Sequence, residues 1–195
     1  MKLLALMCPS CGAPLKAEDE DIVIMCRTCQ SASHITDDGL TLHRVRFLEP
    51  EANSQPTHWL PVWTYLGRVN LQRERQGGSR SAEREAEQFW SEPRRLFVPA
   101  WNLSPLAASR IGQELVEQQP VYHPIDAPPD AYMSPVTFPL EDASKLLELI
   151  VISMEAERRD YLKTINVYFD LGDPALWAFP GRGQGDSWQL LARRQ

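Results

Sequence analysis

All four cysteines of the chain lie close to its N-terminus, in two Cys-x-x-Cys pairs. The pairs are Cys8/Cys11 and Cys26/Cys29, with 14 residues between them. Each pair fits one tight turn on which two thiolates converge, and a β-hairpin between the pairs would complete a tetrahedral set of four. Zn²⁺ prefers these ligands in closed structural sites. The spacing therefore predicts one structural Zn²⁺ per chain, bound by Cys8, Cys11, Cys26 and Cys29.

Other uses of the cysteines remain open at this point. Four thiolates also hold iron in rubredoxin-like sites, and a Cys-x-x-Cys motif can act as a redox dithiol because its thiol pKa is lowered. A redox pair needs only two cysteines on a strand-to-helix turn, so two matched pairs favour a metal. A catalytic zinc would keep an open position, which four thiolates close. His34, five residues after Cys29, is a candidate outer-shell group.

The first pair has further features of a metal-binding turn. In Cys8-Pro9-Ser10-Cys11-Gly12, the proline fixes one φ angle and the glycine can adopt the positive φ needed after the second ligand. This segment, with apolar Leu15 behind it, resembles the zinc-ribbon family over residues 1–45. Gln30 stands where the second turn of that family has glycine, which predicts a less regular turn. The resemblance implies a metal and a β-hairpin fold, but no activity, because zinc ribbons occur in transcription factors, polymerase subunits, enzymes and scaffolds.

The composition is that of a soluble globular protein. The 195 residues, 43% hydrophobic and 24% charged, are enough for a medium domain and a small module. No apolar run approaches the roughly 20 residues that span a bilayer, so no transmembrane segment is expected. The apolar run in the opening residues MKLLALMC is too short for a signal peptide. With no spare cysteine, a cytoplasmic location is predicted.

The charge distribution disfavours nucleic acid as a partner. The net charge is −6, of which residues 1–50 contribute −2 and the remainder −4. Proteins that bind DNA or RNA usually present a positive face to the phosphates. A nucleic-acid role would therefore depend on a local patch, for which Arg27, Arg44 and Arg46 are the candidates.

The patterns predict an α+β fold in which an N-terminal zinc ribbon of β-hairpins precedes an antiparallel-sheet domain with two helices. The ribbon is assigned to residues 1–48, a proline-containing linker to 49–57, and the α+β domain to 58–195. Strands are expected from the dense β-forming residues and period-2 alternation. The expected segments are 3–7, 22–25, 33–36, 40–47, 58–69, 96–101, 164–171, 175–179 and 187–191.

The two expected helices differ in character. One begins at the N-cap Ser104 and ends near Gln119, before a proline. The other spans about 140–161, is apolar nearly all round, and carries acidic residues in its first turn that favour the helix dipole. Residues 72–95 are highly charged and predict a loop, with at most a short helix over 81–89. Residues 120–139 hold six prolines and predict an extended strap over the domain surface.

Two segments could have a chemical role. Trp59, Trp63 and Tyr65 would form a stacking platform if exposed, but burial of one aromatic strand face is the commoner arrangement. The glycine-rich residues 180–186 match no phosphate-binding fingerprint and predict a hairpin turn. Residues with the spacing of a catalytic constellation are not found, and the histidines are scattered.

The sequence thus favours a non-enzymatic protein whose zinc is structural and which acts as a protein–protein interaction or assembly module, through a protein partner or self-association. Two alternatives remain. One is a nucleic-acid or transcription-associated zinc ribbon, and the other is an enzyme with a site among Trp59, Trp63, Tyr65 and residues 180–186.

Overall fold

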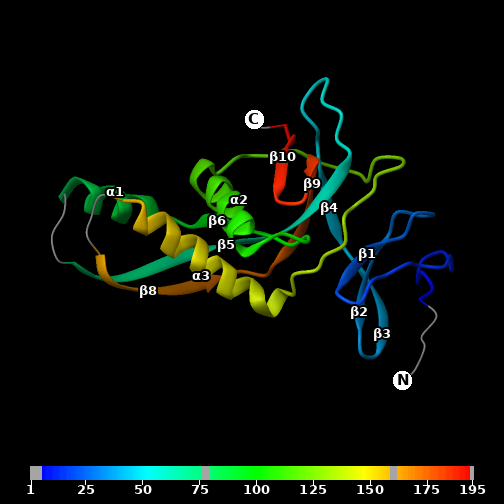
Figure 1. The fold of residues 1–195 in the computed structure, drawn as a ribbon, viewed down its shortest axis with the longest axis horizontal. Coiled ribbons are helices and arrows are strands. Elements are labelled where there is room, and N and C mark those ends of the chain that lie inside the picture. Colours follow the sequence, from blue (N-terminus) through cyan, green and yellow to red (C-terminus); the bar gives the residue numbers. More distant parts are fainter. Residues whose placement is uncertain (1–5, 76–79, 159–161, 194–195) are drawn as a thin grey trace.

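The computed structural model describes residues 6–75, 80–158 and 162–193. These residues form a three-stranded sheet near the N-terminus and a larger sheet that organises the rest of the chain (Figure 1). We call residues 6–43 the cysteine module and residues 45–193 the body. The class is α+β with antiparallel sheets and N-terminal hairpin strands, as the sequence predicts.

The sheet of the cysteine module is a simple antiparallel meander. β1 (Val23–Met25) pairs with β2 (Ala32–Thr36), which pairs with β3 (Gly39–His43). Gly39 has φ 131°, a conformation that side-chain-bearing residues rarely adopt, and it receives a hydrogen bond from the Thr36 hydroxyl at 2.9 Å. The expected first strand, 3–7, lies mostly outside the described residues, and Met7 forms an isolated bridge with Pro14.

The sheet of the body is built around one long strand, β5 (His58–Arg75). One edge of β5 pairs with β6 (Arg94–Pro99). Its other edge pairs first with β9 (Ala175–Gln184) and then with β8 (Leu162–Leu171). The remaining members are β4 (Val45–Leu48), β7 (Pro124–Ile125) and β10 (Ser187–Leu190). All pairs are antiparallel except β4 with β9.

The position of β4 separates the two sheets along the chain. Residues 45–48, which the sequence pattern places with the ribbon, lie parallel to β9 in the large sheet. Only Arg44 stands between β3 of the module and β4 of the body. Local alternation predicts that these residues form a strand, but the choice of sheet depends on a partner about 130 residues further along the chain.

The described residues of the body include three helices: the two expected ones and one in the segment where at most a short helix over 81–89 was expected. α2 (Pro105–Gln118) begins as expected, with the Ser104 hydroxyl accepting a hydrogen bond from the Ala107 N–H at 3.3 Å. α3 (Leu140–Ala156) is the mainly apolar helix. α1 (Arg80–Trp90) was not expected as a full helix. The segment 72–95 is therefore not one charged loop, because it contains the end of β5, α1 and the start of β6.

A buried carboxylate anchors the end of this charged helix. Glu155 of α3 is fully buried and accepts a hydrogen bond from the indole N–H of Trp90, at the end of α1, at 2.7 Å. The same carboxylate forms ion pairs with Arg73 of β5 at 3.2 Å and Arg158 at 2.9 Å. This network joins three elements, and none of its members is close to the others in sequence except Glu155 and Arg158.

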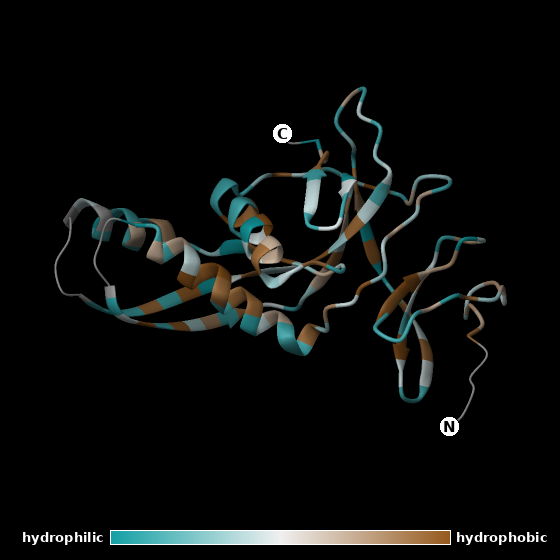
Figure 2. Ribbon diagram, viewed as in Figure 1, coloured by the Kyte–Doolittle hydropathy of each residue, from teal (hydrophilic) through white to brown (hydrophobic). Residues whose placement is uncertain are grey.

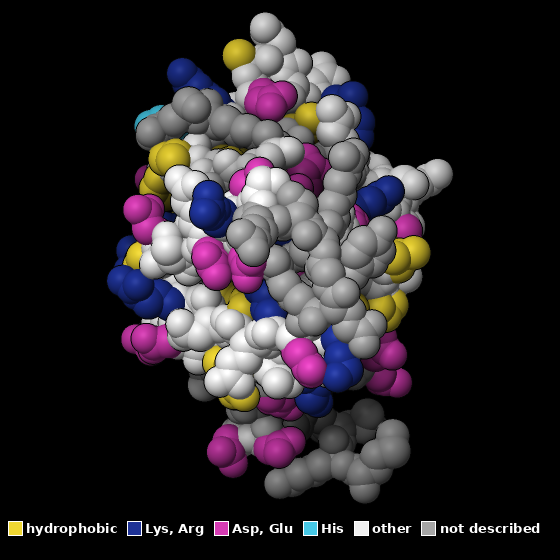
Figure 3. Space-filling model, turned by 90° about the vertical axis from the view of Figure 1, so that its left-hand side faces the viewer, with side chains coloured by type: hydrophobic (Ala, Val, Ile, Leu, Met, Phe, Trp, Pro, Cys, Tyr) yellow, Lys and Arg dark blue, Asp and Glu magenta, His cyan; other side chains and the backbone are white. Residues whose placement is uncertain are grey.

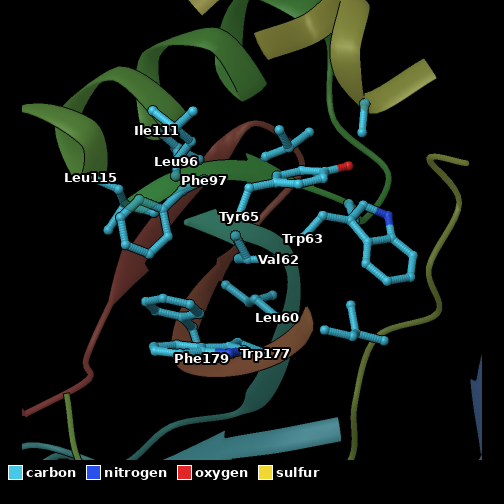
Figure 4. Close-up of a cluster of buried hydrophobic side chains, with 14 of the residues drawn as sticks. Leu60, Val62, Trp63, Tyr65, Leu96, Phe97, Ile111, Leu115, Trp177 and Phe179 are labelled. Carbon is cyan, nitrogen blue, oxygen red and sulfur yellow. The ribbon is translucent and has the colours of Figure 1, made fainter. Parts of the chain in front are cut away.

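The core lies between the large sheet and the helices. Hydrophobic and hydrophilic residues alternate along β5 and β8 in Figure 2. α2 packs on β6, and α3 packs on β6 and β8. Figure 4 shows Trp63 and Tyr65 among the side chains of this core. Trp59, Trp63 and Tyr65 are 5%, 4% and 7% exposed, so all three pack in the interior and none is available as a stacking platform.

The strap at 120–139 connects the module to the body. It is largely extended, and it buries Tyr122, Met133 and Val136. Val136 exchanges backbone hydrogen bonds with the β1 region, donating to Val23 at 2.9 Å and accepting from Ile22 at 2.7 Å. Within the described residues, no helix has the length and apolar character required to cross a membrane.

Candidate metal centre

The first cysteine pair lies on a turn closed by backbone hydrogen bonds. The Gly12 N–H donates to the Cys8 carbonyl at 2.9 Å, and the Cys8 N–H donates to the Ala13 carbonyl at 2.8 Å. Gly12 has φ 74°, which glycine adopts at little cost. The turn therefore directs Cys8 and Cys11 toward one point, as the Cys-Pro-x-Cys-Gly segment predicts.

The second pair repeats this geometry. The Gln30 N–H donates to the Cys26 carbonyl at 2.8 Å, and the Cys26 N–H donates to the Ser31 carbonyl at 2.9 Å. Gln30 has φ 60°, so it takes the left-handed conformation despite its side chain. The expectation of a less regular second turn is wrong. Glutamine is accommodated at an energetic cost rather than by a change of shape.

The two turns bring the four sulfur atoms together. The Sγ atoms of Cys8 and Cys29 lie 3.6 Å apart, those of Cys11 and Cys26 lie 3.7 Å apart, and all four lie within 4.8 Å of one another. These separations exclude disulfides. With Zn–S bonds of about 2.3 Å, the corners of a tetrahedron lie about 3.8 Å apart. The four cysteines thus form a site that could bind a metal ion, with dimensions suited to zinc.

Ser31 is a member of this site that the sequence analysis missed. Its hydroxyl lies 3.1 Å from the Cys29 Sγ and 3.2 Å from the Cys8 Sγ, so it can donate to either sulfur. Polar groups that hydrogen-bond metal ligands are a regular feature of such centres. A serine two residues after the last cysteine was the available signal. His34 was considered for this outer position instead, but its ring packs edge-on against His43, with 6.1 Å between ring centres.

The thiol pKa values follow from these contacts. The hydrogen bond from Ser31 lowers the pKa of Cys29 to about 6. Burial of Cys8 opposes ionisation, but the Ser31 hydroxyl and backbone N–H groups outweigh it and lower the pKa. The N–H of Ala13 favours the Cys11 thiolate, yet the neighbouring thiols, Cys29 first, raise its pKa to about 12. Four thiolates this close need a cation to ionise together, which is the role a metal ion fills.

The module also forms one wall of a surface groove. This groove, of about 790 Å³, is bounded by the module, the strap, the segment after β6 and the β9–β10 hairpin. The Arg27 guanidinium lies 4.9 Å from the centre of the Tyr132 ring, joining module to strap. We call it the module–strap groove; residues that line it include Lys16, Arg27, Trp101, Tyr132, Asp186 and Trp188.

A second groove, of about 1000 Å³, is lined by the β3–β4 connection. Two of the arginines singled out in the sequence, Arg44 and Arg46, line it together with His43 and Asp126. Arg27 lines the module–strap groove instead, so the three arginines do not form one patch.

The glycine-rich segment considered for chemistry forms a hairpin turn. Residues 180–186 belong to the β9–β10 hairpin, in which Gly183 and Gly185 take positive φ angles, so the predicted turn is present. In the hairpin, Asp186 accepts a hydrogen bond from the Ser104 N–H at 2.8 Å, next to the start of α2.

No protein-family model matches the chain, and no match to it is found among curated proteins or solved structures.

Proposed function

We propose that the chain is a zinc-ribbon protein without catalytic activity that acts as a protein–protein interaction or assembly module. The observation that carries this proposal is the set of four converging sulfur atoms, which fills every position of a tetrahedral ion. A metal bound there supplies folding free energy and leaves no position for substrate. Reduced thiols also fit a reducing compartment such as the cytoplasm.

A bound metal would affect binding at the surface by setting the shape of the module–strap groove. Lys16 and Arg27 are tied to the cysteine turns, while Tyr132 and Trp188 come from the body. A metal that fixes the module therefore fixes the distance between the two walls. The groove combines Arg27 with the aromatic rings of Tyr132 and Trp188, and arginine and aromatic residues are enriched where proteins meet.

Native mass spectrometry of the purified protein, before and after a strong chelator, tests this proposal. We expect one zinc per chain in a discrete assembly, either of copies of the chain or with a protein partner, and a smaller assembly when zinc is removed. A zinc-bound monomer that forms no complex, or an assembly that is unaffected by chelation, would contradict the proposal.

A nucleic-acid role has one observation in its favour, the position of Arg44 and Arg46 in the second groove. Asp126 lies in the same groove, and on the face shown in Figure 3 the positive and negative side chains are intermixed. Fluorescence anisotropy with labelled DNA and RNA at two salt concentrations separates the candidates. Salt-dependent binding that R44E/R46E abolishes would favour nucleic acid, whereas the leading proposal predicts no such binding.

A further inference from the structure

The β8 strand has one edge paired with β5 and one edge with no partner in the described part of the chain. It is ten residues long and forms the outer strand of the sheet on that side (Figure 1). A strand edge of this length exposes a row of backbone donors and acceptors that can pair with another chain.

The register shows which backbone groups point outward. The Gly172 N–H donates to the Leu66 carbonyl at 2.9 Å, next to the Gly67–Leu171 pair. In an antiparallel ladder, hydrogen-bonded and non-hydrogen-bonded pairs alternate. Asn166 and Tyr168 therefore bond to β5, while the residues between them present their N–H and C=O groups to the open edge. Those residues are Ile165, Val167 and Phe169.

The side chains of the same residues are incompletely covered. Ile165, Val167 and Phe169 face the helices but are only half-buried, whereas Asn166 and Tyr168 are exposed on the opposite face. A further strand along this edge would cover the apolar row as well as satisfy the backbone groups. Burial and hydrogen bonding thus favour the same neighbour.

The centre of this edge lacks the features that usually prevent an exposed strand from pairing with another chain. From Thr164 to Phe169 it contains no proline and no charged residue. The opposite edge strand, β6, carries Arg94, Arg95 and Pro99, and the short β7 strand begins with Pro124. Charge and proline are the usual protection against strand addition. Their absence from the centre of β8 marks it as a pairing surface.

The composition of β8 favours a copy of itself as the partner. When two β8 strands pair antiparallel about Val167, Ile165 lies opposite Phe169 and Asn166 lies opposite Tyr168. Each hydrogen-bonded pair exchanges two backbone hydrogen bonds. Lys163 and Asp170 do not meet like charges, so self-pairing carries no repulsion. A two-fold axis at Val167 makes the contact closed and symmetric.

We propose that β8 pairs with β8 of a second copy, so that the large sheets of two chains join into one. This contact goes beyond the proposed function, because it lies outside the metal-dependent module. The β8 dimer should therefore persist after chelation, whereas the complex formed through the module–strap groove should be lost. The β8 contact differs from a groove-based interaction because it is made by the backbone of β8, far from the cysteine module in Figure 1.

A proline substitution tests the backbone contact. Val167→Pro removes an outward N–H and leaves the hydrogen bonds that Asn166 and Tyr168 make with β5. Size-exclusion chromatography with light scattering should show a dimer for the wild type and a dimer Kd raised at least about tenfold for Val167→Pro. Val167→Ala keeps the N–H and should remain dimeric. Circular dichroism and zinc content should be unchanged in all of them.

A charge pair tests the register independently of proline. N166K/Y168K places like charges opposite each other across the two-fold axis and should produce monomers. N166E/Y168K, at the same exposed positions, places opposite charges there and should restore the dimer, more strongly at low salt.

Three results would overturn the inference: a wild-type monomer at high micromolar concentration, a dimer unaffected by Val167→Pro, or equal behaviour of the two charge variants. A dimer that survives Val167→Pro but dissociates on chelation would overturn the β8 contact and leave the assembly function in place. A wild-type monomer that loses binding to another protein through Val167→Pro would assign the edge to a different partner and contradict self-pairing.

Discussion

The cysteine module and the body become ordered by different means. In the body, buried side chains from β5, β6, β9, α2 and α3 form one continuous apolar core. In the module, the buried residues are few and small; they are Cys8, Val23, Ile24, Cys26, Ala32 and Ser33. Chains below about 40 residues rarely bury enough apolar surface to fold without a metal or cross-link. The core of the body reaches the module through Val23 and Ala32. We therefore expect the module to depend on this contact together with a metal at the four cysteines, whereas the body has a core of its own.

Removing the metal ligands should have the largest effect, because it should unfold the module and leave the body folded. We expect C26S/C29S to unfold residues 6–43 while the body stays folded, because structural zinc contributes about 10–16 kcal/mol in small zinc-finger peptides. Hydrogen–deuterium exchange would show loss of protection in β1 to β3 and retained protection in β5. Ser10→Ala, in the exposed part of the first turn, is the matched control. Protection of the module equal to the wild type would show that it does not depend on a metal.

In the body, the largest single effect should come from Glu155. Glu155→Ala leaves the half-buried Arg73 and Arg158 without their carboxylate and Trp90 without its acceptor, which costs about 1–3 kcal/mol. Urea unfolding followed by tryptophan fluorescence measures this loss. Glu148→Ala, on the exposed side of α3, should change stability by less than about 0.5 kcal/mol. Zinc affinity should not change in either variant, and equal effects of the two substitutions would contradict the role of the network.

The same contrast explains which features the sequence could predict. The convergence of the four cysteines depends on spacing within one short segment, so the pattern alone predicts that Cys8, Cys11, Cys26 and Cys29 come together. α2 was identified for a similar reason, because Ser104 and the following proline mark its start locally. The contact of Ser31 with Cys29, two residues earlier, is local, but its contact with Cys8 forms only when the two turns meet.

The features that the sequence did not predict depend on contacts between distant segments. α1 was expected as a loop with at most a short helix over 81–89, and the hydrogen bond that anchors its end joins Trp90 to Glu155, 65 residues later. β4 reads as another strand of the ribbon, yet its partner is β9. The unpaired edge of β8 is likewise invisible in the sequence, because alternation predicts a strand but not which neighbours it has.

A substitution at Gln30 should stabilise the module without changing the stability of the body. Gln30→Gly relieves the left-handed strain at φ 60°, offset partly by the greater freedom of glycine in the unfolded chain. The net gain should be about 0.5–1 kcal/mol and should appear as zinc binding tightened about two- to fivefold in chelator competition. Gln30→Ala, which keeps the strain, should show no gain. Stability of the body should stay constant.

The smallest expected effect links the two regions through His43. Its ring lies edge-on to Trp63 of the body, 5.6 Å between ring centres, and burial followed by the nearby His34 lowers its pKa below 6.5. Because the folded state disfavours the charged form, His43 contributes stability that is present above pH 6.5 and is lost as the pH falls through its lowered pKa. The denaturant midpoint should therefore decrease between pH 7.5 and pH 5, and less so in His43→Gln. His34→Gln removes only the weaker of the two causes and should retain most of the pH dependence. Parallel pH profiles for wild type and His43→Gln would show that protonation at this contact does not couple the module to the body.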